Sequence, residues 1–81
     1  MSDKEHSQKF ADMLCGKKIV ACRYLNKEEA ESFGWYSRPL VIFLDDGTAL
    51  IPQSDDEGND GGAIYLNNVD KKTDAIIYVL S

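Results

Sequence analysis

Short runs of β-branched and aromatic residues, separated by polar and glycine-containing segments, occupy most of the chain after residue 16. Such runs predict strands, because branched and aromatic side chains pack well on a pleated surface. Five strands are expected, over residues 17–25, 40–44, 48–53, 63–66 and 75–80. Their spacing of roughly ten to twenty residues predicts a small antiparallel, partly closed barrel. Asp45, Asp46 and Gly47 supply the chemistry of a tight turn between the second and third strands.

A helical pattern precedes the first strand. Phe10, Met13 and Leu14 recur at intervals of three and four residues, which places them on one stripe of a helix. Gly16 stands where helices commonly end. Residues 4–15 are therefore expected to form an amphipathic helix.

A second local signal lies between the first two strands. Asn26 and Glu29 have the spacing of a helix N-cap and its reciprocal partner. Residues 27–33 are expected to form a short helix or a turn-rich excursion, ended by Gly34. With 81 residues the chain makes one domain, 1–81, of the α+β class and mainly β, with the barrel over residues 17–80.

Two of the predicted strands are apolar on both faces, namely residues 40–44 and 76–80. A bare barrel would leave one of those faces in water, so something has to cover it. The N-terminal helix is the first candidate for this cover and a second copy of the chain is the next. Both arrangements can apply together, so a homodimer stays open.

The cysteines and the start of the chain bear on the compartment. No apolar run approaches the ~18 to 20 residues of a membrane-spanning helix, and the polar N-terminus lacks the features of a secretory signal. A cytoplasmic location is therefore expected, where Cys15 and Cys22 would be ordinary buried thiols. Their spacing matches neither a zinc knuckle nor a redox pair, and zinc would need the solvated His6 as a third ligand.

Catalytic signals are missing from the sequence. There is no nucleophile elbow, phosphate-binding glycine loop or zinc-protease motif, and His6 is the only histidine. Asp45 and Asp46 are expected about 20 Å from the acidic residues that follow the third strand, because that strand separates them at ~3.3 Å per residue. A shared pair of catalytic carboxylates is therefore not expected, and the chain is interpreted as a non-enzyme that needs no cofactor.

Charge is distributed unevenly. Residues 28–60 hold nine acidic residues and one basic residue, Arg38, whereas the rest of the chain holds five acidic and eight basic residues. Nucleic-acid binding needs a basic face, and the chain offers only two lysine pairs, Lys17 with Lys18 and Lys71 with Lys72. The acidic segment instead favours a basic protein partner, because opposite charge raises encounter rates and excludes wrong partners.

Residues 54–62 contain no apolar side chain and predict a solvent-exposed loop. Its oxygen-bearing side chains, together with its glycines, also raise the possibility of calcium. The spacing fits an EF-hand poorly, because Asp60 stands where glycine is needed and Leu66 where the closing glutamate should be. The loop residues assigned to partner binding are Asp55, Asp56, Glu57, Asn59 and Asp60.

Three further candidates precede the strand at residues 40–44. Trp35 and Tyr36 would make good anchors for a partner if exposed, although a single tryptophan in a small domain also serves as a core residue. Arg38 is expected to pair either with a loop carboxylate or with a carboxylate of the partner.

Several segments together resemble a set of small uncharacterised bacterial proteins. The segments are Leu14 to Ile19, Pro39 to Val41 with Asp45 to Thr48, and Asp55 to Ala63, with the Asp-Glu-Gly-Asn stretch the most distinctive. The resemblance spans roughly residues 14–66 and implies an SH3-like small β architecture of bacterial or phage origin. It implies no activity and no residue roles.

The function expected from the sequence is that of a non-catalytic protein-binding module, of the inhibitor or immunity type, acting through its acidic face. Two alternatives stay open. One is a calcium-responsive module acting through loop 54–62, and the other is a structural homo-oligomer.

Overall fold

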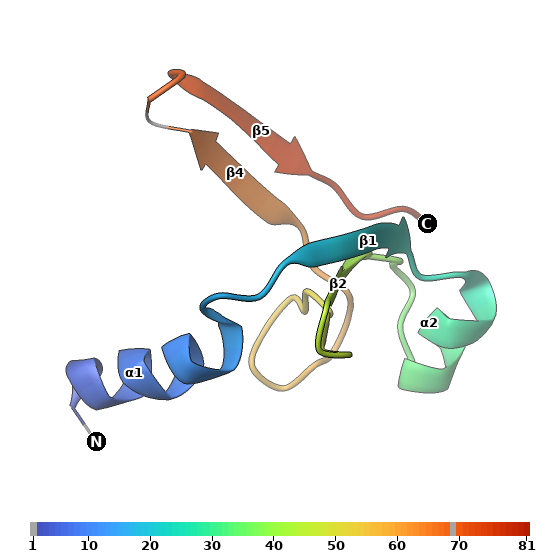
Figure 1. Ribbon diagram of the computed structural model, residues 1–81. Coiled ribbons are helices and arrows are strands. Elements are labelled where there is room, and N and C mark those ends of the chain that lie inside the picture. The colour runs from blue at the N-terminus through green and yellow to red at the C-terminus, as the bar shows by residue number, and fades with distance from the viewer. Residues whose placement is uncertain (1, 69) are drawn as a thin grey trace.

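The computed structural model describes residues 2–68 and 70–81. Two helices and five strands follow one another along the chain (Figure 1). In chain order they are α1 Asp3–Leu14, β1 Ile19–Tyr24, α2 Lys27–Phe33, β2 Leu40–Leu44, β3 Ala49–Leu50, β4 Ile64–Asn68 and β5 Thr73–Ile77. The predicted α+β class with mainly β structure is confirmed.

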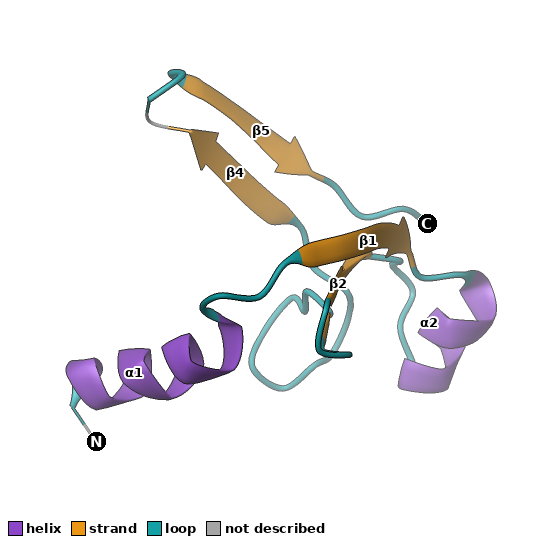
Figure 2. Ribbon diagram, viewed as in Figure 1, coloured by secondary structure: helices purple, strands orange, loops and turns teal. Residues whose placement is uncertain are grey.

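The five strands form two separate antiparallel sheets (Figure 2). One sheet has the order β1-β2-β3, and the other is the β4-β5 hairpin. The described residues form no closed barrel, so the predicted five-stranded, SH3-like barrel is not confirmed. β3 has only two residues and pairs with β2, while β4 and β5 pair with each other, so no strand ladder joins the hairpin to the first sheet.

Both helices begin as local chemistry dictates. Ser2 accepts a hydrogen bond from the backbone of Glu5, whose side chain returns to Ser2, and Asn26 and Glu29 form the same reciprocal arrangement at α2. Gly34 ends α2 in the left-handed conformation, at φ 78°, which a side chain would strain. The predicted short helix over residues 27–33 is therefore confirmed.

The buried core is small and lies between α2 and the first sheet. It consists of Leu25, Ala30, Trp35 and Val41, with Phe43 and Ile51 packed against it. Antiparallel pairing of β1 with β2 and of β2 with β3 holds the strands that carry this core.

Helix α1 does not cover either sheet, contrary to the prediction for the N-terminal helix. None of its described side chains is buried, and Figure 1 shows it standing away from both sheets. Phe10, Met13 and Leu14 are 40% to 55% exposed, so the predicted stripe exists but is not buried against the described part of the chain. The two cysteines are also exposed, and the prediction of buried thiols is wrong because Cys15 follows the uncovered helix and Cys22 lies on a strand with no cover.

The β4-β5 hairpin projects from the first sheet and is attached mainly through the segment that follows it (Figure 1). Arg38 and Leu80 exchange backbone hydrogen bonds of 2.7 and 3.0 Å. The Tyr24 hydroxyl donates to the carbonyl of Tyr78 at 2.9 Å. The hairpin is therefore fixed at its base, while its own side chains stay largely in water.

Candidate functional site

Loop 54–62 lies against the segment that follows α2. The indole Nε1–H of Trp35 donates to the carbonyl oxygen of Gly58 at 2.7 Å. Trp35 is only 6% exposed and stacks on Phe33, with 4.7 Å between ring centroids. The interpretation of Trp35 as a core residue is confirmed, and its polar edge adds a connection to the loop that the sequence did not predict.

Asp60 fixes the other end of the loop. Its carboxylate accepts hydrogen bonds from the Ser37 backbone at 2.9 Å, from the Ser37 hydroxyl at 3.3 Å and from the Gly61 backbone at 2.8 Å. These donors, the Ser37 backbone above all, lower the pKa of Asp60 because they favour its charged form. The Asp60 carboxylate therefore holds the loop through three hydrogen bonds within the chain.

Asp55 plays a similar internal role. It accepts hydrogen bonds from the Asn59 side chain at 2.8 Å and from the backbones of Asn59 and Glu57 at 3.2 and 3.0 Å. Hydrogen bonding from Asn59 is the largest cause of its lowered pKa. Asn59 is engaged in the same turn, and both residues are exposed.

The two glycines that close the loop permit unusually close packing. A Cβ on Gly61 would lie 2.6 Å from the Pro39 ring, and a Cβ on Gly62 would lie 2.5 Å from the Gln53 carbonyl oxygen. The loop therefore rests directly on backbone and on the segment before β2. Glycine at these positions is a requirement of space.

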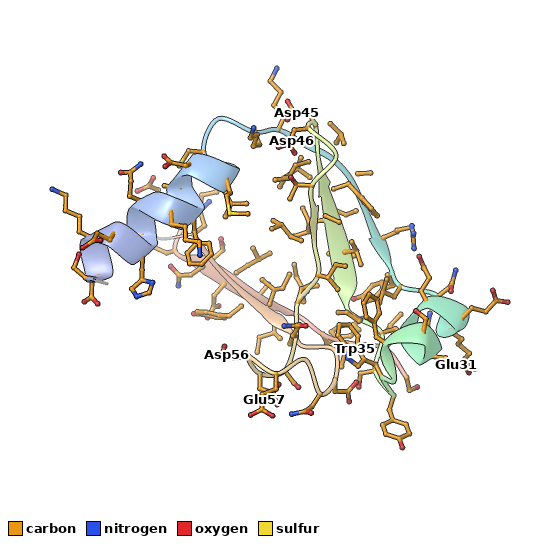
Figure 3. The ribbon with its side chains drawn as sticks, turned by 90° about the horizontal axis from the view of Figure 1, so that it is seen from below. Glu31, Trp35, Asp45, Asp46, Asp56 and Glu57 are labelled. Atoms are coloured by element: carbon orange, nitrogen blue, oxygen red, sulfur yellow. The ribbon has the colours of Figure 1, made fainter. Side chains whose placement is uncertain are left out.

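Four acidic side chains at this end of the molecule remain directed to solvent. Their carboxylates accept no hydrogen bond and form no ion pair within the part of the chain that the structure describes. They are Glu28 and Glu31 on α2 and Asp56 and Glu57 on the loop. Figure 3 shows Glu31 on one side of Trp35 and the loop pair on the other. We call these four residues, with Tyr36 between them in the chain, the acidic end.

Tyr36 is 89% exposed, the highest value among the exposed large apolar residues. Beside it lies a pocket of about 480 Å³. The pocket is lined by Lys27, Ala30, Glu31, Gly34, Trp35, Tyr36, Arg38 and Ser81. Its mixture of apolar and charged walls suits a side chain of another protein. The sequence did not predict the pocket, because its walls come from α2, the segment before β2 and Ser81.

Arg38 pairs with no loop carboxylate, so that half of its predicted role is wrong. Its guanidinium donates to the carbonyl oxygens of Leu25 at 3.2 Å and Ser81 at 3.2 Å. It thereby holds the segment after β5 against the core. Asp60 instead accepts hydrogen bonds from Ser37, and Asp55 accepts them from within the loop.

The remaining acidic residues of the segment 28–60 lie elsewhere or are neutralised. Asp45 and Asp46 lie at the opposite end of the first sheet from Asp56 and Glu57 (Figure 3), as the sequence predicted. Thr48 and Lys17 lower the pKa of Asp46 to about 2, and the Lys17 amino group lies 3.1 Å from its carboxylate. Arg23 and the Asn26 backbone lower the pKa of Glu29 to about 2. Of the nine acids, therefore, the four of the acidic end are exposed there and accept no hydrogen bond from the described residues, whereas Asp45 is exposed at the opposite end.

No group of three or more histidine, cysteine or acidic side chains gathers closely enough among the described residues to hold a metal ion. None of the described helices is long and apolar enough to cross a membrane.

Comparisons with protein-family models, curated proteins and solved structures gave no match. The resemblance to small bacterial proteins therefore stays a prediction. The function has to be argued from the acidic end itself.

Proposed function

We propose that the protein is a non-catalytic binding module whose acidic end receives a basic segment of a partner protein. The observation that carries the proposal is that the acidic residues of loop 54–62 differ in their hydrogen bonding. Asp55 and Asp60 are used to fix the loop, which leaves Asp56 and Glu57 exposed on a rigid support. A surface held in place before binding loses little conformational freedom on association.

The neighbouring pocket and Tyr36 supply the apolar part of such an interface. Tyrosine contributes a large contact area at low entropic cost, and it is enriched where binding energy concentrates. Glu31 lines the pocket together with Lys27 and Arg38, and Glu28, Asp56 and Glu57 add exposed carboxylates on α2 and the loop. We infer that the partner inserts one side chain into the pocket while lysine or arginine residues face the carboxylates.

The test compares two variants that carry the same change in charge. The first neutralises the acidic end through Glu28→Gln, Glu31→Gln, Asp56→Asn and Glu57→Gln. The control neutralises four exposed acids elsewhere through Asp3→Asn, Asp12→Asn, Asp45→Asn and Asp70→Asn. Each immobilised protein captures partners from a lysate, and association rates with the captured partner are measured between low and physiological salt.

We expect the first variant to associate on the order of tenfold more slowly at low salt and to lose most of its salt dependence. The control should behave like the unmodified protein. Equal association rates and equal salt dependence for both variants would show that binding does not use the acidic end.

A further inference from the structure

Most of the exposed large apolar side chains lie away from the acidic end. Eleven large apolar side chains are exposed among the described residues, and two of them, Phe33 and Tyr36, belong to the region around α2. The other nine lie on α1, at the start of β1, and on or next to the β4-β5 hairpin. They are Phe10, Met13, Leu14, Ile19, Val20, Tyr65, Leu66, Ile76 and Tyr78. We call this set the outer apolar surface.

The hairpin is apolar on both of its faces. Tyr65 lies opposite Ile76, and Leu66 lies opposite Ala75. Because side chains alternate along a strand, Tyr65 and Ile76 share one face and Leu66 lies on the other. Tyr65, Leu66 and Ile76 are 61%, 50% and 64% exposed. An isolated two-stranded hairpin is marginally stable at best in water, so contacts beyond its attachment at the base would stabilise this one.

The exposed area of the protomer measures how much cover is missing. The chain exposes 6316 Å², whereas a folded monomer of its mass exposes about 4,900 Å². Its radius of gyration is 14.2 Å, compared with about 11.7 Å for a compact domain of this length. The excess area is about 1,400 Å² per chain, which lies within the roughly 1,000–2,500 Å² that each subunit of an obligate homodimer buries.

The charge of this region suits a second copy. Helix α1 and residues 64–77 together hold five acidic and four basic residues, so two identical surfaces would not repel each other strongly. The segment 28–60, with nine acids and one base, would repel its own copy. Phenylalanine, tyrosine and methionine are also the residue types enriched at the centres of protein interfaces.

We propose that two copies of the chain associate through the outer apolar surface, with the α1 stripe and the hairpin of each copy buried against the other. The interface is self-complementary, as in a two-fold symmetric dimer. It leaves both acidic ends exposed, so it is independent of the proposed partner binding. Failure of one proposal leaves the other intact.

Sedimentation equilibrium of the full chain tests this association, together with thermal unfolding at several protein concentrations. We expect twice the mass of the chain at micromolar concentration and an unfolding midpoint that rises with concentration. Phe10→Gln combined with Ile76→Thr should raise the dimer dissociation constant about 100-fold. The control Tyr36→Gln, which changes a more exposed aromatic outside this surface, should leave the constant unchanged.

Hydrogen exchange on the unmodified chain provides a test that needs no variant. Amides of α1, β4 and β5 should gain protection as concentration rises, whereas those of β2 should change little. A monomer at all concentrations, with a constant unfolding midpoint, would overturn the proposal and assign the surface to a different protein. A dimer that Phe10→Gln with Ile76→Thr does not weaken would also overturn it.

Discussion

The two ends of this small protein contain similar kinds of apolar residue and use them differently. Around α2 the chain buries Leu25, Ala30 and Trp35 and fastens a polar loop over them. At the other end, none of the described side chains of α1 is buried. The comparison teaches that the described residues form one packed core, and that the large apolar side chains around α1 and the hairpin stay exposed outside it.

The largest test of this comparison is removal of a core side chain. Trp35→Ala should lower the free energy of unfolding by about 3–5 kcal/mol, because it empties the centre of a core of only a few residues. Phe10→Ala should lower the free energy of unfolding by less than about 0.5 kcal/mol, when measured at a protein concentration below the dissociation constant of the proposed dimer. Denaturant unfolding of both variants checks the difference, and comparable losses would show that α1 is packed within the protomer.

A smaller effect is expected where the loop closes on itself. Gly62→Ala should cost about 1–3 kcal/mol, because the new Cβ would meet the backbone of Gln53 and Ser54, which cannot turn aside. The variant should also change the fluorescence of Trp35, whose indole bonds to the same loop.

Gly16→Ala is the contrasting substitution. Nothing lies within 4 Å of a Cβ added at this position, so the only strain comes from the positive φ that the new alanine would have to adopt. Its Trp35 fluorescence should match that of the unmodified protein. An altered spectrum for Gly16→Ala, or an unaltered one for Gly62→Ala, would contradict the packing of the loop described above.

The smallest effect separates neighbouring acids of the same loop. Asp60→Asn should lower the unfolding midpoint, because it replaces a carboxylate that accepts three hydrogen bonds, whereas Asp56→Asn should leave the midpoint unchanged. The pKa of Asp60 is lowered in the folded protein, so its stabilisation is present above the ordinary value near 3.8 and is lost as the pH falls through the lower folded value.

The same sign applies to Glu29 and Asp46, whose pKa values are lowered to about 2. Stability should therefore decrease as the pH is lowered from about 4.5 to about 2. The stability of the Asp60→Asn variant should fall less steeply over this pH range than the stability of the Asp56→Asn variant. Parallel pH profiles for the two variants would refute the structural role of Asp60.

The parts of the fold that sequence predicted are those set by neighbouring residues. Asn26 with Glu29 determined α2, and the branched run at residues 40–44 determined β2. The cover of the sheet was not predictable in this way, because a stripe such as that of Phe10, Met13 and Leu14 indicates what a helix needs to bury and does not say against what. The predicted cover by α1 was wrong for that reason.

The candidate site was also predictable only in part from the sequence. Composition identified loop 54–62 as acidic and exposed. Which acids hold the loop and which accept no hydrogen bond depends on Ser37 and Trp35, which lie 23 residues away from Asp60 and Gly58. No local pattern distinguishes Asp60 from Asp56, so only the folded arrangement separates them.

The hydrogen bond from Trp35 to Gly58 also equips the protein with its own optical probe. Trp35 is the only tryptophan of the chain, and its indole is attached directly to the acidic loop. A partner that displaces or stiffens this loop would alter the emission wavelength, while association of two chains through α1 and the hairpin would leave it nearly constant. One unlabelled sample can therefore report on the two kinds of contact separately, fluorescence following the first and light scattering the second.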